Sequence, residues 1–230
     1  STLFPYTTLF RSILIQYNKI LLQRNTLLKQ IREKGVFDVG LLEVLNLQLV
    51  EAGERIFSRR KQFMERFLPE FERYYAFLST DAEQVALVYE SPLMGQDFET
   101  LLRQSIDRDR ALERTTQGIH KDDLLFTIHD GMVLKKFGSQ GQQKSFLIAL
   151  KLAQYSFLRA CKQYKPLLLL DDIFDKLDEY RTRKLMQLVS EDEFGQIFLT
   201  DTNGERIKQI FDEIEKPIRI FEVKGGTVDV

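Results

Sequence analysis

The stretch from Lys165 to Arg181, KPLLLLDDIFDKLDEYR, decides the fold class. Its run of leucines, Leu167 to Leu170, predicts a strand that is buried on both faces. The strand leads directly into Asp171 and Asp172. In sheets that alternate with helices, ligands bind beyond the carboxyl ends of the strands. The stretch therefore predicts an α/β core with two carboxylates at its ligand-binding edge.

The segments around this strand alternate between helix and strand patterns. Upstream, LLFTIH and MVLKKF flank an Asp130-Gly131 turn and predict a hairpin. Downstream, a helix from about Asp178 leads to the strand QIFLT and a further helix. The last pair, PIRIFEV and TVDV, surrounds Gly225-Gly226. The alternation predicts a parallel-rich sheet with flanking helices over residues 116–230.

Two helical patterns precede this core. Apolar residues recur at helical spacing over residues 13–34, and Gly35 ends that helix. A longer pattern covers residues 38–78, with a kink or break expected at Pro69. We therefore expect an antiparallel helical arm over residues 13–80. Its second helix should face its partner through Leu42, Leu45, Leu49, Ile56, Phe63 and Phe67.

Residues 81–115 return the chain from the arm to the core. Apolar residues alternate in QVALVYE and predict a strand with one face on a core. A turn from Pro92 to Gly95 then leads into a helix that we expect from about Asp97 to Arg114.

The composition fits a folded chain with one large or two small domains. The 230 residues are 43% hydrophobic with a net charge of −1, so bulk charge indicates neither a nucleic acid nor a membrane as partner. No apolar run approaches the roughly 18 residues of a membrane span. The single cysteine, Cys161, should pack on its helix, and with only two histidines a zinc site is not expected. We expect a cytoplasmic protein.

Residues 1–12, STLFPYTTLFRS, look foreign to the rest of the chain. They lack the continuous apolar region and the small-residue cleavage site of a targeting segment. They resemble the in-frame translation of a common sequencing adapter. We therefore expect an assembly artefact joined to a truncated gene, with the natural sequence starting at Ile13 and with poor packing of residues 1–12.

The run from Phe137 to Gln154, FGSQGQQKSFLIALKLAQ, places a glycine turn before an apolar helix. It is not a P-loop, G-x-x-x-x-G-K-[ST], because Gln143 stands where a glycine should precede Lys144. Ser139-Gln140-Gly141-Gln142 instead resembles the signature of ABC-type ATPases, usually LSGGQ. That motif places a serine and backbone N–H groups at a helix N-terminus against the γ-phosphate held by the opposite subunit. For SQGQ alone, a simple helix cap is the alternative.

The leucine strand and its aspartates have the pattern of a Walker B motif. Asp171 is the candidate magnesium ligand, and Asp172 is the candidate that orients or deprotonates the attacking water. Asp175-Lys176-Leu177-Asp178 occupies the D-loop position, so Asp178 is a further site residue. Two solvated aspartates after an ordinary buried strand are the alternative. Signature, Walker B and D-loop in this order and spacing favour the ATPase.

Taken together, these motifs resemble the RecF family of bacterial recombination and repair ATPases. The resemblance is carried by both quoted runs, by GQIFLTDT, and by Gly118 to Asp123, GIHKDD, which is similar to the family's G-P-H-R-D-D element. YNKILLQRNTLLKQI is similar to the family's first arm helix. The resemblance covers Ile13 to Val230. It implies an α/β fold in which part of an ABC-type head, its C-terminal half, follows a helical arm called lobe II.

The resemblance also implies a function for the intact protein. It would bind ATP and magnesium, form an ATP-dependent homodimer around two nucleotides, bind double-stranded DNA and gaps or junctions, and help RecO and RecR to load recombinase. The family's P-loop precedes the arm, and no such motif occurs in these 230 residues. We therefore expect the chain to be inactive alone.

Two positions depart from the wider ABC pattern. Asp172 stands where most members have glutamate, which suits a slow, switch-like ATPase. Thr200-Asp201-Thr202 replaces the customary switch histidine. The roles of Asp172 and of the switch position in hydrolysis therefore stay open.

The arm offers a candidate for contact with DNA. Arg59, Arg60 and Lys61 lie in a basic run that fits either DNA phosphates or a solvated helix face. His120 favours a structural role over that of a ligand or base. A non-catalytic DNA-binding or scaffold module is the alternative function, and a head fragment of the SMC type is a further one that the short arm disfavours.

Overall fold

The computed structural model describes residues 6–34, 38–79, 85–128, 131–171 and 177–229. The chain divides into two compact units. The arm unit contains Ser1–Leu68 and Ala86–Thr127, and the head unit contains Pro69–Val85 and Ile128–Val230. No helix in the described ranges is long and apolar enough to cross a membrane.

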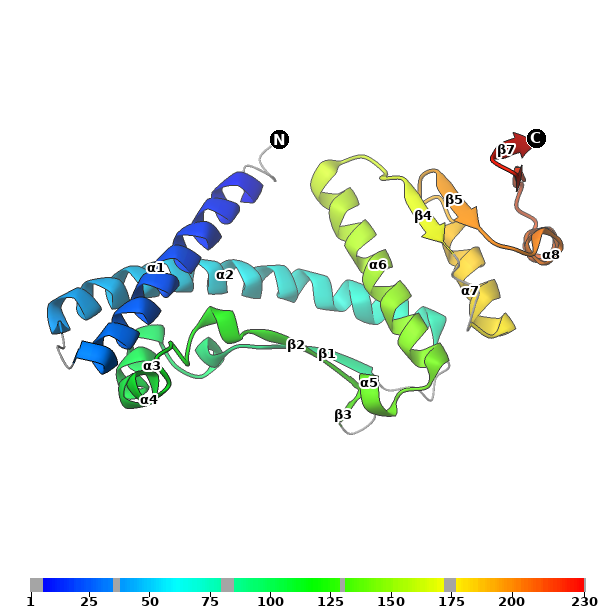
Figure 1. The fold of residues 1–230 in the computed structure, drawn as a ribbon. Coiled ribbons are helices and arrows are strands. Elements are labelled where there is room, and N and C mark those ends of the chain that lie inside the picture. The colour runs from blue at the N-terminus through cyan, green and yellow to red at the C-terminus, as the bar shows by residue number, and fades with distance from the viewer. Residues whose placement is uncertain (1–5, 35–37, 80–84, 129–130, 172–176, 230) are drawn as a thin grey trace. The chain divides into compact units, whose positions relative to one another are not determined.

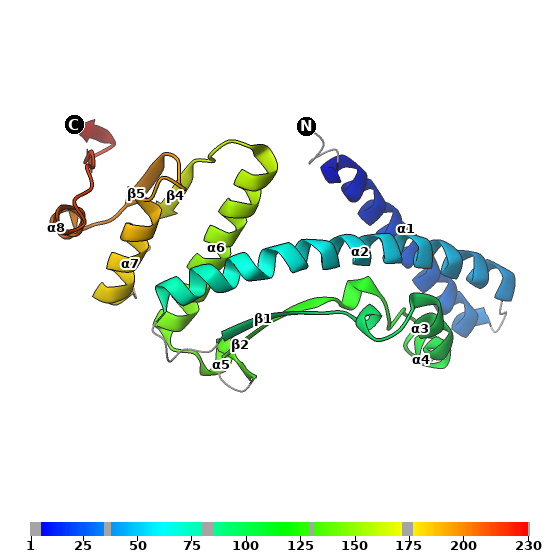
Figure 2. The ribbon, with the colours of Figure 1, turned by 180° about the vertical axis from the view of Figure 1, so that it is seen from behind.

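The arm unit is built on two long helices. Helix α1 (Tyr6–Lys34) crosses helix α2 (Val39–Leu78) at an angle, as Figures 1 and 2 show from opposite sides. At the start of α2 the Asp38 carboxylate accepts a hydrogen bond from the Leu41 N–H at 2.9 Å, which caps the helix. The expected hairpin is confirmed. Helix α2 continues through Pro69, so a break there is wrong, whereas a kink at this residue stays a prediction.

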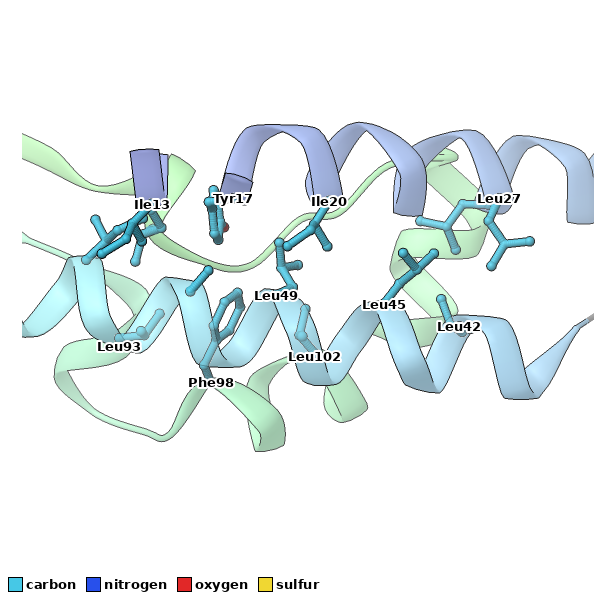
Figure 3. Close-up of a cluster of buried hydrophobic side chains, with 14 of the residues drawn as sticks. Ile13, Tyr17, Ile20, Leu27, Leu42, Leu45, Leu49, Leu93, Phe98 and Leu102 are labelled. Atoms are coloured by element: carbon cyan, nitrogen blue, oxygen red, sulfur yellow. The ribbon is translucent and has the colours of Figure 1, made fainter. Parts of the chain in front are cut away.

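The arm core follows the helical spacing of its apolar residues. Figure 3 shows Ile13, Tyr17 and Ile20 of α1 directed toward the apolar face of α2. One expectation is wrong: Phe63 is exposed and stacks on Phe67 with ring centroids 5.1 Å apart, instead of entering this core. Buried members of the core include Leu27, Leu28, Ile31, Leu42, Leu45, Leu49, Ile56, Leu93, Phe98, Leu102 and Ile119.

The described part of residues 1–12 does not match the expectation of poor packing throughout. Helix α1 already begins at Tyr6. Phe10 is partly buried and packs against the arm core, whereas Leu9 is half exposed. The proposed origin of these residues stays a prediction.

The returning segment of the arm unit is more broken than expected. Strand β1 (Val85–Glu90) and the 3-10 turn η1 (Pro92–Met94) precede helices α3 (Phe98–Gln104) and α4 (Ile106–Leu112). The single helix expected from Asp97 to Arg114 is thus wrong. It is interrupted at Ser105, whose hydroxyl donates to the Leu102 carbonyl at 3.3 Å and competes with the helix ladder.

A second 3-10 turn and a sheet complete this segment. Turn η2 (Ile119–Lys121) leads into strand β2 (Asp123–Ile128), and one sheet has the order β1-β2-β3. Strand β3 is only Met132–Val133, and helix α5 (Leu134–Phe137) follows it. The strand expected over MVLKKF is therefore wrong beyond Val133. Burial of Leu134 and the Gly138 N–H bond to its carbonyl at 2.8 Å favour a helical turn instead.

The rest of the head unit alternates helices with strands as expected. Helix α6 (Gln140–Lys162) precedes strand β4 (Leu168–Asp171), helix α7 (Glu179–Val189), strand β5 (Ile197–Thr200) and helix α8 (Gly204–Glu213). Strands β4 and β5 pair in parallel, with Leu168 opposite Ile197 and Asp171 opposite Thr200. Cys161 is buried on α6, as expected.

The carboxyl-terminal hairpin forms around the expected glycine turn, but the strand expected over PIRIFEV is wrong before Glu222. Strands β6 (Glu222–Lys224) and β7 (Thr227–Asp229) pair antiparallel. Gly225 and Gly226 form the turn with φ of 56° and 85°, values that favour glycine.

Strand β4 corrects one expectation of the sequence. Leu168 and Leu170 are buried, but Leu167 and Leu169 are 62% and 70% exposed. The strand is therefore buried on one face among the described residues. Alternation of the exposed and buried leucines follows the two-residue repeat of a strand.

Candidate functional site

Two of the predicted site residues meet at the carboxyl ends of the parallel strands. Asp171 ends β4 and Thr200 ends β5, and the strand register places them opposite each other. The Thr200 hydroxyl donates a short hydrogen bond to Asp171 Oδ1. Both residues are exposed. The register thus presents a carboxylate and a hydroxyl together at the edge where parallel sheets bind ligands.

The neighbouring Asp201 is committed to local structure. Its carboxylate accepts hydrogen bonds from the Arg206 guanidinium at 2.5 Å and from the Asn203 N–H at 2.6 Å. The Asn203 side chain in turn caps helix α8 by accepting from the Arg206 N–H at 3.0 Å. The residues at the predicted switch position therefore differ: Thr200 faces Asp171, whereas Asp201 fixes the start of α8.

The predicted signature opens helix α6. The Ser139 hydroxyl oxygen accepts from the Gln142 N–H at 3.1 Å, and the Gln142 side chain accepts from the Ser139 N–H at 2.8 Å. This reciprocal pair is a capping box. The N–H groups of Gln140 and Gly141 lie in the first turn, where no earlier helical carbonyl is available to them.

The helix cap uses only one of the hydrogen-bonding sites of the Ser139 hydroxyl. A hydroxyl has one donor and two acceptor sites, and the cap uses an acceptor. An anion at this helix end could therefore accept from the Ser139 O–H and from first-turn N–H groups. Ser139 to Gln142 form a group of their own, separate from the bonded pair Asp171 and Thr200.

The other predicted site residues of the head either cap a helix or lie outside the described residues. Asp178 caps helix α7 by accepting from the Arg181 N–H at 2.8 Å. It also forms an ion pair with the Arg181 guanidinium at 3.5 Å. Asp172, the predicted catalytic carboxylate, and Asp175 lie outside the described residues. In the described ranges no three His, Cys, Asp or Glu side chains are grouped so as to hold a metal by themselves.

On the arm, the residues of the predicted basic run differ in their exposure and in their contacts. Arg59 and Lys61 are exposed on α2. Arg60 instead donates from Nη1 to the Ile119 carbonyl at 2.8 Å and to Asp122 Oδ2 at 2.5 Å. The Asp122 side chain is 5% exposed. The helical repeat separates these neighbours, so that Arg60 faces inward while the residues on either side of it face solvent.

The GIHKDD element is fixed to the arm helices at several points. Asp122 also accepts from the Tyr89 hydroxyl at 2.7 Å, and burial together with this carboxylate raises the pKa of Tyr89. The His120 ring bonds the Tyr17 hydroxyl through Nδ1 at 3.0 Å and the Thr115 carbonyl through Nε2 at 3.1 Å. Burial lowers the pKa of His120. These contacts give His120 the structural role expected of it.

A buried ion pair that the sequence did not reveal lies beside this element. Arg24 of α1 donates from Nη1 to Asp109 at 2.8 Å and to the Thr115 hydroxyl at 2.7 Å, and from Nε to Asn46 at 2.7 Å. Both charged side chains are 0% exposed. Arg24 sits on the apolar face of α1, and that position was the only signal in the sequence that could have identified it.

Asp109 completes this network through a neighbouring residue. Its Oδ1 accepts from the Thr116 N–H at 2.8 Å and from the Thr116 hydroxyl at 2.6 Å. Among the described residues, Arg24 Nη2 is left without a hydrogen-bond partner. The network therefore joins α1, α2, α4 and the segment that leads into GIHKDD.

Comparison with curated proteins gives a consistent set of relatives. The chain is 50% identical over 91% of its length to the DNA replication and repair protein RecF of Flavobacterium johnsoniae. It is 44% identical over 97% of its length to the protein of that name from Phocaeicola vulgatus, and 43% identical over 97% to that from Bacteroides thetaiotaomicron. The chain is a relative of RecF.

The solved structures agree with this relationship. The recombination mediator protein RecF of the RecFOR pathway, solved with ATP, matches 96% of this chain at a TM-score of 0.72 and 26% identity. A second structure of this protein, RecF-ATPrS, matches 96% of this chain at a TM-score of 0.71 and 27% identity. The fold is thus that of a partial ABC-type head with a helical arm. No protein-family model matches the chain.

The RecF relatives are longer than this chain. The chain spans 58% of the Flavobacterium johnsoniae protein, 59% of the Phocaeicola vulgatus protein and 58% of each of these solved chains. The similarity therefore includes all of the described motifs but not the whole length of those proteins.

Proposed function

We propose that this chain is part of a RecF-type protein that binds ATP and magnesium between two copies and binds DNA at gaps or junctions in recombinational repair. The observation that carries the proposal is the pairing of Asp171 with Thr200 at the carboxyl ends of β4 and β5. Parallel sheets place ligand-binding groups at this edge. The RecF protein solved with ATP supports a nucleotide as the ligand.

The residues present fit a magnesium ion. Mg²⁺ prefers hard oxygen ligands and is held through one or two carboxylates together with phosphate oxygens and waters. Asp171 is exposed and lies beside the Thr200 hydroxyl, so the site provides oxygen ligands open to solvent. Asp171 would hold the ion, which would neutralise phosphate charge. Asp172 is the candidate to orient the attacking water, and Thr200 would hold the carboxylate of Asp171 in place.

The signature fits a phosphate presented by another copy of the protein. Ser139 caps α6 with an acceptor site and retains its O–H for donation. The first-turn N–H groups of Gln140 and Gly141 add donors at the positive end of a 23-residue helix. Gln142 holds the serine by the reciprocal bond. ATP would therefore bridge two heads, and dimerisation would depend on ATP.

The arm offers phosphate contacts of a different kind. Arg55, Arg59 and Arg66 recur at helical spacing along one face of α2, and Lys61 is exposed nearby in the sequence. Arg60 makes its strongest contacts with Asp122, so we assign it to holding the arm rather than primarily to DNA. RecO and RecR are the expected partners in recombinase loading, in line with the RecFOR pathway of the solved RecF proteins.

A full-length hybrid tests the proposal. In it, residues 13–230 of this chain replace the matching part of the Flavobacterium johnsoniae relative. We expect the hybrid to hydrolyse ATP and to dimerise only with ATP. Asp171→Asn should weaken magnesium-dependent ATP binding by the monomer. Ser139→Arg should leave monomer binding intact and abolish dimerisation, and equal loss of monomer binding in both variants would contradict the assignment of the signature to the opposite copy.

A non-catalytic DNA-binding or scaffold module is the second candidate. The aspartate at position 172 and the absence of a switch histidine favour it. Nucleotide-driven dimerisation without turnover in the hybrid would support this alternative. For the 230-residue chain alone we expect no ATP turnover, because no segment of it has the P-loop sequence that cradles the β- and γ-phosphates. Tight ATP binding by this chain in calorimetry would overturn that expectation.

A further inference from the structure

One carboxylate in the head unit collects donors from two helices. Glu193 lies in the turn between α7 and β5, and its side chain is 17% exposed. Its Oε1 accepts from Arg159 of α6 at 2.8 Å and from Arg73 of α2 at 3.2 Å. The hydroxyls of Tyr74 and Ser156 each donate to the same atom at 3.2 Å. We refer to Glu193 and these four partners as the Glu193 cluster.

Charge holds this cluster together. Burial by itself would raise the pKa of Glu193, but the hydrogen bond from Arg73 lowers it below the ordinary value. Burial would likewise lower the pKa of Arg73, but its hydrogen bond to Glu193 raises it. Burial raises the pKa of Tyr74 to about 12, so its hydroxyl remains a donor. At neutral pH, Glu193 is therefore a carboxylate shared by two guanidinium groups.

The same turn fixes the start of strand β5. The Glu193 carbonyl accepts from Arg159 Nη1 at 2.7 Å, and the Gly195 N–H donates to the Tyr155 hydroxyl at 2.9 Å. Phe194 packs on Tyr155 with ring centroids 4.9 Å apart. Side chain, backbone and ring contacts thus all fasten this turn to α6.

The start of strand β4 is fastened to the same turn. The Leu168 N–H donates to the Gln196 carbonyl at 3.0 Å. A Cβ on Gly195 would lie 2.9 Å from the Lys165 Cβ, so the two chain segments approach too closely for a larger residue. Both strands of the parallel pair therefore begin at an anchored point.

Anchoring the starts of these strands sets the position of their ends. A strand rises about 3.3 Å per residue, so Asp171 and Thr200 lie about 10 Å beyond the first paired residues of their strands. Residues Leu168 to Asp171 pair one for one, without a bulge, with residues Ile197 to Thr200. A shift at the turn would move Asp171 and Thr200 together, along the strand axis.

Helix α2 connects this anchor to the helix that carries the signature. Residues 69–78 of α2 belong to the head unit and provide Arg73 and Tyr74. In the same segment, Phe71 packs on Phe146 of α6 with ring centroids 4.6 Å apart. One helix end therefore contacts both α6, which begins just after Ser139, and the turn that opens β5.

We propose that Glu193 is a positioning residue that links the end of α2 to the ends of β4 and β5. Contact of DNA with α2 would then change the placement of Asp171 and Thr200. This inference rests on the proposed function, since it assigns Asp171 and Thr200 to a nucleotide site. Glu193 precedes the start of β5, whereas Thr200 lies at the other end of that strand. Glu193 acts on Asp171 and Thr200 through the starts of β4 and β5. Its hydrogen bond with Arg73 connects it to α2.

The test uses the full-length hybrid with Glu193→Gln, Arg73→Gln and both changes together. Glu191→Gln, at an exposed glutamate of the same turn, is the matched control. We expect amide hydrogen exchange in Ile197–Thr200 to rise roughly tenfold in both single variants, the change that loss of a charge-assisted hydrogen bond allows. The double variant should match the single ones, because the two residues act as one unit. Glu193→Asp should restore part of the protection.

Activity provides the second readout. In Glu193→Gln and Arg73→Gln, the ratio of ATPase rates with and without DNA should lie nearer to one than in the unmodified hybrid. Unchanged exchange in Ile197–Thr200, or an unchanged DNA ratio in an active hybrid, would overturn the proposal. If the unmodified hybrid has no ATPase at all, the proposed function fails by itself, and the exchange measurement still decides whether Glu193 positions the strand ends.

Discussion

Two of the charged clusters among the described residues differ in how far water reaches them. In the arm unit, the Arg24 and Asp109 side chains are 0% exposed. In the head unit, Glu193, Arg159 and Arg73 keep 17%, 34% and 50% of their side chains exposed. A buried pair cannot separate without leaving an unpaired charge in an apolar core, whereas a partly solvated cluster can exchange partners with water. The first is thus suited to fix one conformation and the second to permit adjustment.

The largest effect is expected from breaking the arm pair. Arg24→Ala leaves Asp109 charged in the arm core and should lower the free energy of unfolding by about 3–5 kcal/mol. Urea unfolding of the chain, followed by circular dichroism, measures this. Replacement of both partners by Arg24→Met and Asp109→Leu should cost less than Arg24→Ala alone, because no charge is then left unpaired. A cost under about 1 kcal/mol for Arg24→Ala would show that water reaches the pair.

The next effect concerns the glycine that starts GIHKDD. Gly118 has φ of 129°, and an added Cβ would lie 2.6 Å from Phe98 Cζ and 2.8 Å from the Tyr17 hydroxyl. Gly118→Ala therefore combines backbone strain with overpacking and should cost about 3 kcal/mol in the free energy of unfolding. Gly131 has φ of 86° with no atom within 4 Å of such a Cβ, so Gly131→Ala isolates the strain alone. Equal costs would mean that contact with Phe98 is unimportant.

A smaller effect follows from pH at the same element. Burial lowers the pKa of His120, so the folded state binds fewer protons there than the unfolded state. The stability from neutral His120 is fully present above the unfolded pKa of about 6.5 and is lost as pH falls below it. Lys121 opposes protonation, and Asp109 and Asp122 favour it. We expect the urea midpoint to fall from pH 7 to pH 5, and to fall less in His120→Gln; identical slopes would contradict this.

The sequence predicted the helices of the arm better than the long-range hydrogen bonds and ion pairs that hold them in place. Helical spacing identified the faces of α1 and α2, because burial of an apolar stripe dominates such helices. It did not predict the break at Ser105 or the inward turn of Arg60, because both depend on partners remote in sequence. Asp109 meets a residue 85 positions away, and Asp122 meets one 62 positions away. Local propensity carries no information on such pairs.

The head shows the same limit at the candidate site. Consecutive parallel strands made it predictable that Asp171 and the carboxyl end of QIFLT share one edge. No pattern in the sequence indicated that Thr200, rather than Asp201, faces Asp171, since a shift of one residue turns a side chain to the other face of a strand. Glu193 was missed because it lies in an ordinary acidic turn, and Arg73 is 120 positions away. Four leucines in a row likewise could not show that only one face is buried.

The smallest effect is expected on the exposed face of the β4–β5 pair. Leu169 and its partner Phe198 are 70% and 48% exposed, whereas Leu168 is buried. Leu169→Thr should change the free energy of unfolding by less than about 0.5 kcal/mol, while Leu168→Ala should cost about 2–4 kcal/mol through lost burial and a cavity. The same Leu169→Thr change should raise solubility, because an exposed apolar strand face favours association. Light scattering and urea unfolding measure the two properties on one sample. If Leu169→Thr destabilised the chain as much as Leu168→Ala, the exposed face of the β4–β5 pair would be covered in solution. The two faces of the pair would then differ less in burial than the structure indicates.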